Sequence, residues 1–203
     1  MKDLGLASRC LGIEFHQDTK NHSVYITQRQ YTEAILERFG MQDCKEVKTP
    51  IDINISLTKP ERPNERLMQQ YPYQRLIGAL MYLAVSTRPD IAYAVNLMSQ
   101  FNTNFTVEHW VAAKRILRYL KGTVNYGLMY QRTNKQLYGA VDADWGSNTV
   151  DRRWYSGYAF ILAGAAVSWE ARKQRNLALS SVEAEYMAIS EATKEAIYLR
   201  GTE

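Results

Sequence analysis

The chain has 203 residues, which suits one large domain or two small ones. Its composition, 46% hydrophobic and 23% charged residues with 11 glycines and 5 prolines, is that of a globular protein rather than a disordered or linker-rich one. Two cysteines exclude a disulfide framework and a cysteine-based zinc cluster, and the longest apolar run, nine residues from Ile77, is too short to span a bilayer. The net charge of +4 permits nucleic acid as a partner, and MKDLGLASR does not resemble a signal peptide, so we expect an intracellular protein.

Residues 11–26 predict a β-hairpin, because two segments that alternate apolar and polar residues, LGIEF and SVYIT, flank the turn-forming sequence QDTKNH. A helix is expected next, with Thr27 as its N-cap, apolar residues at every fourth position and Gly40 as its stop. Gly12 lies within the first predicted strand. A glycine there indicates either the close backbone approach of a ligand or a β-bulge.

Residues 44–68 predict an extended connection, since they contain three prolines and only one short apolar pattern. Three helices are expected after it. The first spans 73–85, the second opens at STRPD and ends near Phe101, and the third runs from a Thr106 cap to Gly122. The third helix has apolar residues at helical spacing, which predict a buried stripe of Trp110, Ala113, Leu117 and Leu120.

After Tyr130 the hydrophobic pattern changes to a period of two, which predicts β-strands. The expected strands are 137–142, 155–162 and 165–169, with a glycine turn between the last two. The change of composition near Arg132 predicts a domain boundary, which gives domains 1–132 and 133–203.

Ser180 and Glu183 form an S-x-x-E capping box, which predicts the start of a final helix. The apolar residues of this helix recur at helical spacing. They predict an inner face of Val182, Tyr186, Ile189, Thr193 and Ile197.

Two pairs of acids stand where they could bind a metal ion. Asp142 and Asp144 end a predicted strand, and Glu183 and Glu185 lie in the first turn of the final helix. Carboxylates that face one another can hold Mg²⁺, and two such ions suit phosphodiester hydrolysis. From their spacing alone, the same acids fit solvated turn and helix-dipole residues better than a metal site.

The third predicted helix carries four basic residues beside its apolar stripe: Lys114, Arg115, Arg118 and Lys121. They could contact nucleic-acid phosphates or form an ordinary solvated face. The three histidines, His16, His22 and His109, have no metal-ligand spacing, and we expect them at the surface.

A family resemblance covers essentially the whole chain. The segment that begins DADWGSNTVDRRWYSGYAF and continues through SSVEAEYMAISEATKEAIYLR resembles the ribonuclease H domain of copia-type LTR retrotransposon Pol polyproteins. YPYQRLIGALMYLAVSTRPDIAYAVNLMSQF and HWVAAKRILRYLKGT resemble the end of the reverse transcriptase of the same polyprotein, and MKDLG and LGIEFHQD resemble its last palm strands. The implied fold is mixed α+β: a palm-end β-hairpin and helical thumb in residues 1–132, then a truncated ribonuclease H-like antiparallel sheet with one helix in residues 133–203.

The resemblance also implies roles for individual residues. Gly12 falls in the primer grip, and the helix around Gln74, Gly78 and Ala79 resembles the thumb helix that lies in the minor groove of the template–primer. The basic third helix fits the same thumb region. Asp142 corresponds to the first catalytic aspartate of ribonuclease H and Glu185 to its catalytic glutamate. Both would be Mg²⁺ ligands, with Asp144 and Glu183 as the neighbouring alternatives.

The implied activity is RNA-directed DNA synthesis with Mg²⁺-dependent hydrolysis of the RNA strand of an RNA–DNA hybrid. The paired polymerase aspartates of the family belong before Met1, and two further ribonuclease H carboxylates belong after Glu203, so we expect the isolated chain to be inactive. The alternatives are a non-catalytic nucleic-acid-binding remnant, a domesticated element or a product without function. The expected partners are an RNA–DNA hybrid or template–primer duplex and the rest of the Pol polyprotein, not a membrane. The expected place is the cytoplasm, in a virus-like particle, or the nucleus, without secretion.

Overall fold

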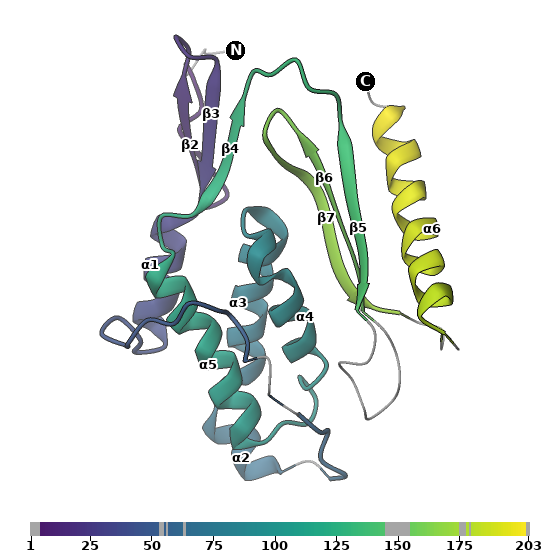
Figure 1. Cartoon of the computed structure of the whole chain (residues 1–203). Coiled ribbons are helices and arrows are strands. Elements are labelled where there is room, and N and C mark those ends of the chain that lie inside the picture. The colour runs from purple at the N-terminus through teal and green to yellow at the C-terminus, as the bar shows by residue number, and fades with distance from the viewer. Residues whose placement is uncertain are drawn as a thin grey trace. The chain divides into compact units, whose positions relative to one another are not determined.

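The computed structural model describes residues 5–52, 55, 57–62, 64–144, 155–174, 178 and 180–201. The chain is mixed α+β and divides into two compact units, Met1–Met129 and Tyr130–Glu203 (Figure 1). The point of division falls within strand β4 (Gly127–Gln131). Among the described residues, no helix is both long and apolar enough to cross a membrane.

The first unit begins with the predicted hairpin. The strand order of its sheet is β1 (Arg9–Cys10), β2 (Ile13–Asp18), β3 (Ser23–Thr27) and then β4. Strands β2 and β3 are antiparallel, with Phe15 opposite Ile26. The Asp18 carboxylate closes their turn by accepting from the backbone N–H groups of Lys20 and Asn21, which is why an aspartate suits this position.

The start of helix α1 (Arg29–Arg38) corrects the predicted cap. Thr27 is the last residue of β3, and the N-cap residue is Gln28, whose side chain makes no capping bond. The Glu14 carboxylate of β2 instead accepts from the backbone N–H of Gln30 at 2.9 Å. The cap therefore comes from a neighbouring strand, because a carboxylate beside the first turn satisfies the same free N–H groups.

The predicted stop at Gly40 is confirmed. Its φ of +62° is one that glycine adopts without strain. The N–H of Gly40 bonds to the carbonyl of Glu37, and the N–H of Met41 bonds to that of Leu36. This is the Schellman arrangement that satisfies the last carbonyls of a helix.

The predicted extended connection ends four residues early, because a short helix, α2 (Glu65–Gln70), begins after Asn64. The Asn64 side chain caps it by accepting from the N–H of Leu67. The three predicted helices are present as α3 (Tyr73–Ser86), the one-turn η1 (Pro89–Ile91) leading into α4 (Ala92–Ser99), and α5 (Val107–Gly122).

The core of the first unit lies among α1, α3, α4 and α5. It includes fully buried side chains from all four helices: Ile35, Leu76, Leu80, Leu83, Val95, Met98, Ile116, Leu117 and Leu120. Tyr73 is also buried, and its hydroxyl donates to the carbonyl of Met98, so one bond ties the start of α3 to the end of α4. Of the predicted α5 stripe, Trp110 is only partly buried.

His109 corrects the expectation of three surface histidines. His16 and His22 are exposed, but His109 is buried and forms the capping box of α5 with Thr106. Its Nδ1 accepts from the backbone N–H of Thr106 at 3.0 Å. The residue three places after the cap is usually Glu or Gln, and here a neutral imidazole supplies the same acceptor.

The second unit contains an antiparallel sheet of β5 (Tyr138–Asp144), β6 (Tyr155–Leu162) and β7 (Ala165–Lys173). Ala163 and Gly164, both with positive φ, form the two-residue turn between β6 and β7, as a type I′ hairpin requires. Gly139 of β5 lies opposite Phe160, and a Cβ there would stand 2.6 Å from the Phe160 ring. The close contact with the Phe160 ring therefore explains why this position is a glycine.

Helix α6 (Ser181–Arg200) packs on this sheet with a face other than the predicted one. Ser180 caps it as predicted, accepting from the N–H of Glu183. The buried residues are Ala184, Ala188 and Ala192. The predicted inner residues are exposed: Val182 70%, Tyr186 75%, Ile189 55% and Ile197 67%, with Thr193 exposed as well.

Candidate nucleic-acid interface

The outer face of α3 has a glycine in its middle. Gly78 is exposed, and a Cβ added there would meet nothing within 4 Å. A glycine inside a helix costs about 1 kcal/mol relative to alanine. Neither packing nor backbone conformation accounts for this glycine, in contrast to Gly127, where a Cβ would stand 2.2 Å from the carbonyl oxygen of Ile26.

Gly78 lies in a groove between α1 and the start of α3, which we call the α3 groove. It has a volume of roughly 630 Å³ and is lined by Tyr31, Arg38, Phe39, Pro72, Arg75, Gly78 and Ala79. Its charged lining is two arginines without an acid. Neither Arg38 nor Arg75 forms an ion pair among the described residues. Sequence reasoning missed both, since Arg38 belongs to another helix and reads as a complement to the dipole of α1.

One turn along α3 from Gly78, Tyr82 holds the turn between β1 and β2. Its hydroxyl donates to the carbonyl of Leu11, and its ring packs edge-on against Tyr31. Leu11 and Gly12 have φ of +50° and +79°. Gly12 thus lies in a turn and not within a strand or a β-bulge, and the close approach of a ligand to it stays a prediction. The contact of Tyr82 brings this turn to the same helix as Gly78.

Gln74, a further predicted contact residue, donates from its side-chain amide to the carbonyl of Asn102 at 2.9 Å. It is exposed at the start of α3, one turn before Gly78. Three predicted interface residues, Gln74, Gly78 and Gly12, are therefore carried by α3 or by the turn bound to it. Their contact with nucleic acid stays a prediction.

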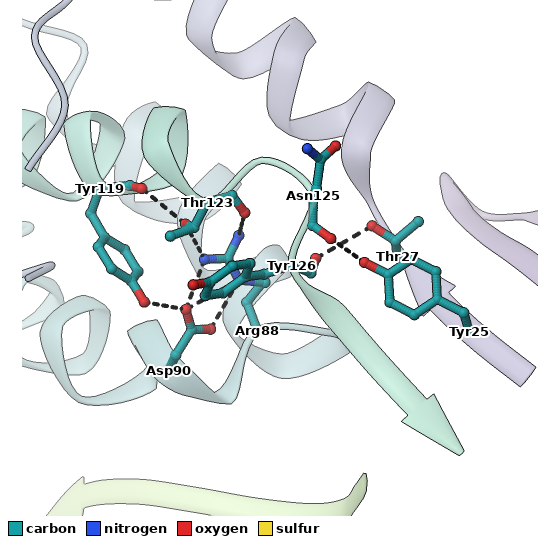
Figure 2. A network of polar contacts seen from close by, with 8 residues as sticks. All are labelled: Tyr25, Thr27, Arg88, Asp90, Tyr119, Thr123, Asn125 and Tyr126. Carbon is teal, nitrogen blue, oxygen red and sulfur yellow. Dashed lines mark hydrogen bonds and ion pairs between the residues drawn. The ribbon is translucent and has the colours of Figure 1, made fainter. Parts of the chain in front are cut away.

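A buried arginine fixes the end of α3 against the end of α5. Arg88 donates from Nε and Nη2 to the Asp90 carboxylate at 2.9 and 2.7 Å, and from Nη1 to the carbonyl of Thr123 at 3.0 Å. Its guanidinium lies 5.7 and 5.6 Å from the ring centroids of Tyr119 and Tyr126 (Figure 2). An arginine fork can satisfy several acceptors at once. Arg88 therefore fixes the position of Thr123, the residue at which the chain leaves α5.

The same region is tied to the hairpin. Tyr25 donates to the carbonyl of Asn125, and Thr27 donates to that of Tyr126 (Figure 2). Tyr119 donates to Asp90 at 2.8 Å, and burial together with this carboxylate raises the pKa of Tyr119 to about 12. The phenol is therefore a fixed donor at any physiological pH.

The predicted basic face of α5 has partners within the protein. Residues 41–52, which we call the strap, lie along it. Arg115 donates to Thr49 Oγ1 at 3.0 Å, Arg118 to the carbonyl of Lys45 at 2.7 Å, and Lys121 to that of Gln42. Lys114 has no such bond among the described residues. Contact of these four side chains with nucleic acid stays a prediction, and three of them already hold the strap.

The predicted metal-binding acids of the second unit lie near the end of β5 and the start of α6. β5 ends at Asp144 and α6 begins at Ser181, and these ends are adjacent (Figure 1). Asp142 and Glu185 are both exposed, and Asp142 lies opposite Gly157. Within the described part of the chain, no three His, Cys, Asp or Glu residues gather in a way that could hold a metal ion. Mg²⁺ binding by Asp142 and Glu185 stays a prediction, and the Asp144 side chain lies outside the described residues.

Comparison with known proteins gives clear relatives. The chain is 40% identical over 204 aligned residues to the retrovirus-related Pol polyprotein from transposon TNT 1-94 of Nicotiana tabacum, covering 98% of this chain and 15% of that protein. It is 37% identical over 186 residues to that of transposon RE2 of Arabidopsis thaliana, 91% of this chain and 12% of that protein. It is also 52% identical over 133 residues to the secreted RxLR effector protein 161 of Plasmopara viticola, 65% of this chain and 94% of that protein.

These matches define the class: retrovirus-related Pol polyproteins of transposons. The chain belongs to the copia-type LTR retrotransposon Pol family, as the sequence resemblance indicated. It spans about one seventh or less of the polyproteins it matches. No protein-family profile matches it. No solved structure matches it either.

Proposed function

We propose that this chain is the part of a retrotransposon Pol polyprotein that combines the reverse transcriptase palm end and thumb with the first part of a ribonuclease H-like domain. In this proposal the first unit binds the template–primer duplex or RNA–DNA hybrid without sequence preference. Arg38 and Arg75 contact phosphates, and the bare backbone of Gly78 lets the duplex approach α3. The α5 residue Lys114, with Arg115, Arg118 and Lys121, adds to the positive field of this unit.

The observation that carries the proposal is Gly78. The helix would be more stable with alanine at this position, and open space surrounds it. The close approach of a partner would explain the glycine. The two arginines of the α3 groove indicate that this partner is negatively charged. The Leu11–Gly12 turn, held by Tyr82, adds a second bare backbone segment to the same helix.

The test separates binding from stability. The purified chain is titrated against a fluorescently labelled RNA–DNA hybrid, and anisotropy is measured over a range of salt concentrations. Gly78→Ala should raise the free energy of unfolding by up to about 1 kcal/mol and weaken binding, because the methyl group intrudes on the duplex. The double variant Arg38→Gln with Arg75→Gln should make the negative slope of log K against log salt shallower. The expected change is about 1.8 if each arginine neutralises one phosphate and the B-DNA value of about 0.9 per phosphate applies.

The matched control for Arg38→Gln alone is Arg29→Gln, which removes one positive charge from the other end of α1, where Arg29 is paired with Glu33. Binding should then fall much less than with Arg38→Gln. If Gly78→Ala stabilises the fold and leaves affinity unchanged, or if Arg29→Gln weakens binding as much as Arg38→Gln does, the α3 groove is not the binding surface.

A second function is favoured by one comparison. A relative of 52% identity is named a secreted effector rather than a Pol polyprotein, and the alignment covers 94% of its length. A non-catalytic remnant or domesticated element is therefore the alternative for this chain. Primer extension by the isolated chain should be absent in either case, and so should cleavage of an RNA–DNA hybrid.

Mg²⁺ binding by Asp142 and Glu185, with Asp144 and Glu183 as alternatives, remains a proposal taken from the family resemblance. A magnesium titration followed by amide chemical shifts tests it. Perturbation at the ends of β5 and α6 that disappears in Asp142→Asn supports the assignment, and unchanged shifts there reject it for this chain.

A further inference from the structure

Thr49 combines three properties that other hydroxyl residues of this chain do not share. It precedes Pro50, and this is the one Ser/Thr–Pro dipeptide in the sequence. It is exposed in the strap, a segment without regular secondary structure. Its Oγ1 accepts a hydrogen bond from Arg115 Nη2 at 3.0 Å.

Arg115 has capacity that the protein leaves unused. Its Nη1 lies 3.5 Å from the Asp52 carboxylate. Its Nε is buried and has no acceptor among the described residues. Nε and Nη2 form one edge of the guanidinium, the edge that binds a carboxylate or phosphate through two parallel hydrogen bonds. One of those two donors already contacts Thr49, and the other has no acceptor within the described part of the chain.

We propose that Thr49 is a phosphorylation site for a proline-directed Ser/Thr kinase and that Arg115 is the receptor for its phosphate. Oγ1 attacks the γ-phosphorus of ATP, so an O–P bond forms as the bond from that phosphorus to the β–γ bridging oxygen breaks. ADP leaves, and the hydroxyl proton passes to the base of the kinase. The product places three acceptor oxygens beside the Nε–Nη2 edge.

The expected consequence is a strap bound more firmly to α5. The buried Nε of Arg115 gains an acceptor, and a hydrogen bond from the guanidinium to a neutral hydroxyl becomes an ion pair with a phosphate, which is the stronger interaction. Asp52 stays on the other edge of the guanidinium, at Nη1, so it does not compete for the phosphate donors. The inference does not rest on the proposed nucleic-acid function, because the contact between Thr49 and Arg115 is present in the protein alone.

The experiment uses the full chain with MgATP and a recombinant proline-directed kinase. Mass spectrometry should find one phosphate, on Thr49, and none in Thr49→Val or Pro50→Ala. ³¹P NMR should show that the phosphate binds its second proton about tenfold more weakly than an ordinary phosphate, whose second pKa is about 6. Amide exchange in residues 42–49 should slow several-fold.

Arg115→Gln should return the phosphate pKa to its ordinary value. Arg115→Lys keeps the charge without the fork, and we expect it to lower that pKa only in part. Failure of the folded chain to accept phosphate at Thr49 overturns the site. An ordinary phosphate pKa in the phosphorylated wild type, or a lowered one that persists in Arg115→Gln, overturns the assigned receptor.

Discussion

Arg88 allows a sharp test of what holds the first unit together. Replacing it with methionine keeps a long unbranched side chain and removes the charge and all five donors. The Arg88 side chain is 3% exposed, whereas the Asp90 side chain is 31% exposed. Hydrogen exchange of α3 and α5, measured by mass spectrometry, reports the opening free energy of this unit alone.

The expected loss follows from the groups left behind. Breaking a buried ion pair by removing one member costs about 3–5 kcal/mol, and the part-exposed Asp90 places this pair at the low end. The Thr123 carbonyl also loses the Nη1 donor, and an unsatisfied buried acceptor costs about 1–3 kcal/mol. We therefore expect about 4 kcal/mol in all, which corresponds to nearly a thousandfold loss of amide protection.

The matched control is Arg29→Met. It makes the same replacement in the Arg29–Glu33 pair, whose side chains are 56% and 50% exposed. An exposed pair four residues apart in a helix contributes about 0.3–0.5 kcal/mol. The reasoning is that Arg88 contributes strongly to the free energy of unfolding because it is buried, and not merely because it is paired. A loss below about 1.5 kcal/mol in Arg88→Met, or equal losses in the two variants, would refute it.

Three further predictions concern separate parts of the chain. Burial lowers the pKa of His109; the unfolded chain therefore binds more protons near and below the ordinary His pKa of about 6.5, so stability should fall as the pH drops through that range. His109→Gln keeps the capping acceptor and should flatten this dependence in urea unfolding, and an unchanged slope would show that other groups cause it. Gly139→Ala should destabilise the second unit by about 1–3 kcal/mol, because its Cβ would meet the Phe160 ring; a neutral effect in thermal unfolding would mean that the ring moves aside freely. Ala188→Leu should cost about 1–3 kcal/mol by overpacking, whereas Tyr186→Ala should change stability by no more than about 0.5 kcal/mol; the reverse order, measured by circular dichroism, would restore the face predicted from the sequence.

Local signals explain which elements could be predicted. The β2–β3 hairpin and helices α3 and α5 were found because strand alternation, turn residues and helical periodicity are properties of short segments. The cap of α1 was not, because its acceptor is Glu14, on another element. The α2 helix was hidden among prolines, although Asn64 with Glu65 is a recognisable start.

The residues of the candidate interface also fall into two groups, those predicted from the sequence and those that only the structure brings together. Gly78 was predicted because the sequence of its helix resembles the family's thumb helix. Arg38 could not be, since the α3 groove brings it together with Arg75 from a different helix. The STRPD pattern placed Pro89 correctly in a first turn, but the partners of Arg88 on α5 lie more than thirty residues further on.

Helix α6 shows why an apolar stripe does not always mark the buried face. Its inner face combines three alanines with two acids, and the acids are the reason for the error. Arg172 of β7 donates to Glu191 at 2.6 Å, and Ser168 of β7 donates to Glu195 at 2.7 Å. Gln174, just beyond β7, donates to the carbonyl of Ala184 at 3.0 Å.

These three bonds join α6, between Ala184 and Glu195, to β7 and to the residue that follows it. Small alanine side chains let its backbone lie close enough to the sheet for such bonds to form. Larger residues on that face would keep the polar partners apart, so the alanines and the acids depend on each other. A prediction that places every acid in solvent therefore assigns the wrong face of α6 to the sheet. The donors to Glu191 and Glu195 lie on β7, and the sequence of the helix alone does not reveal them.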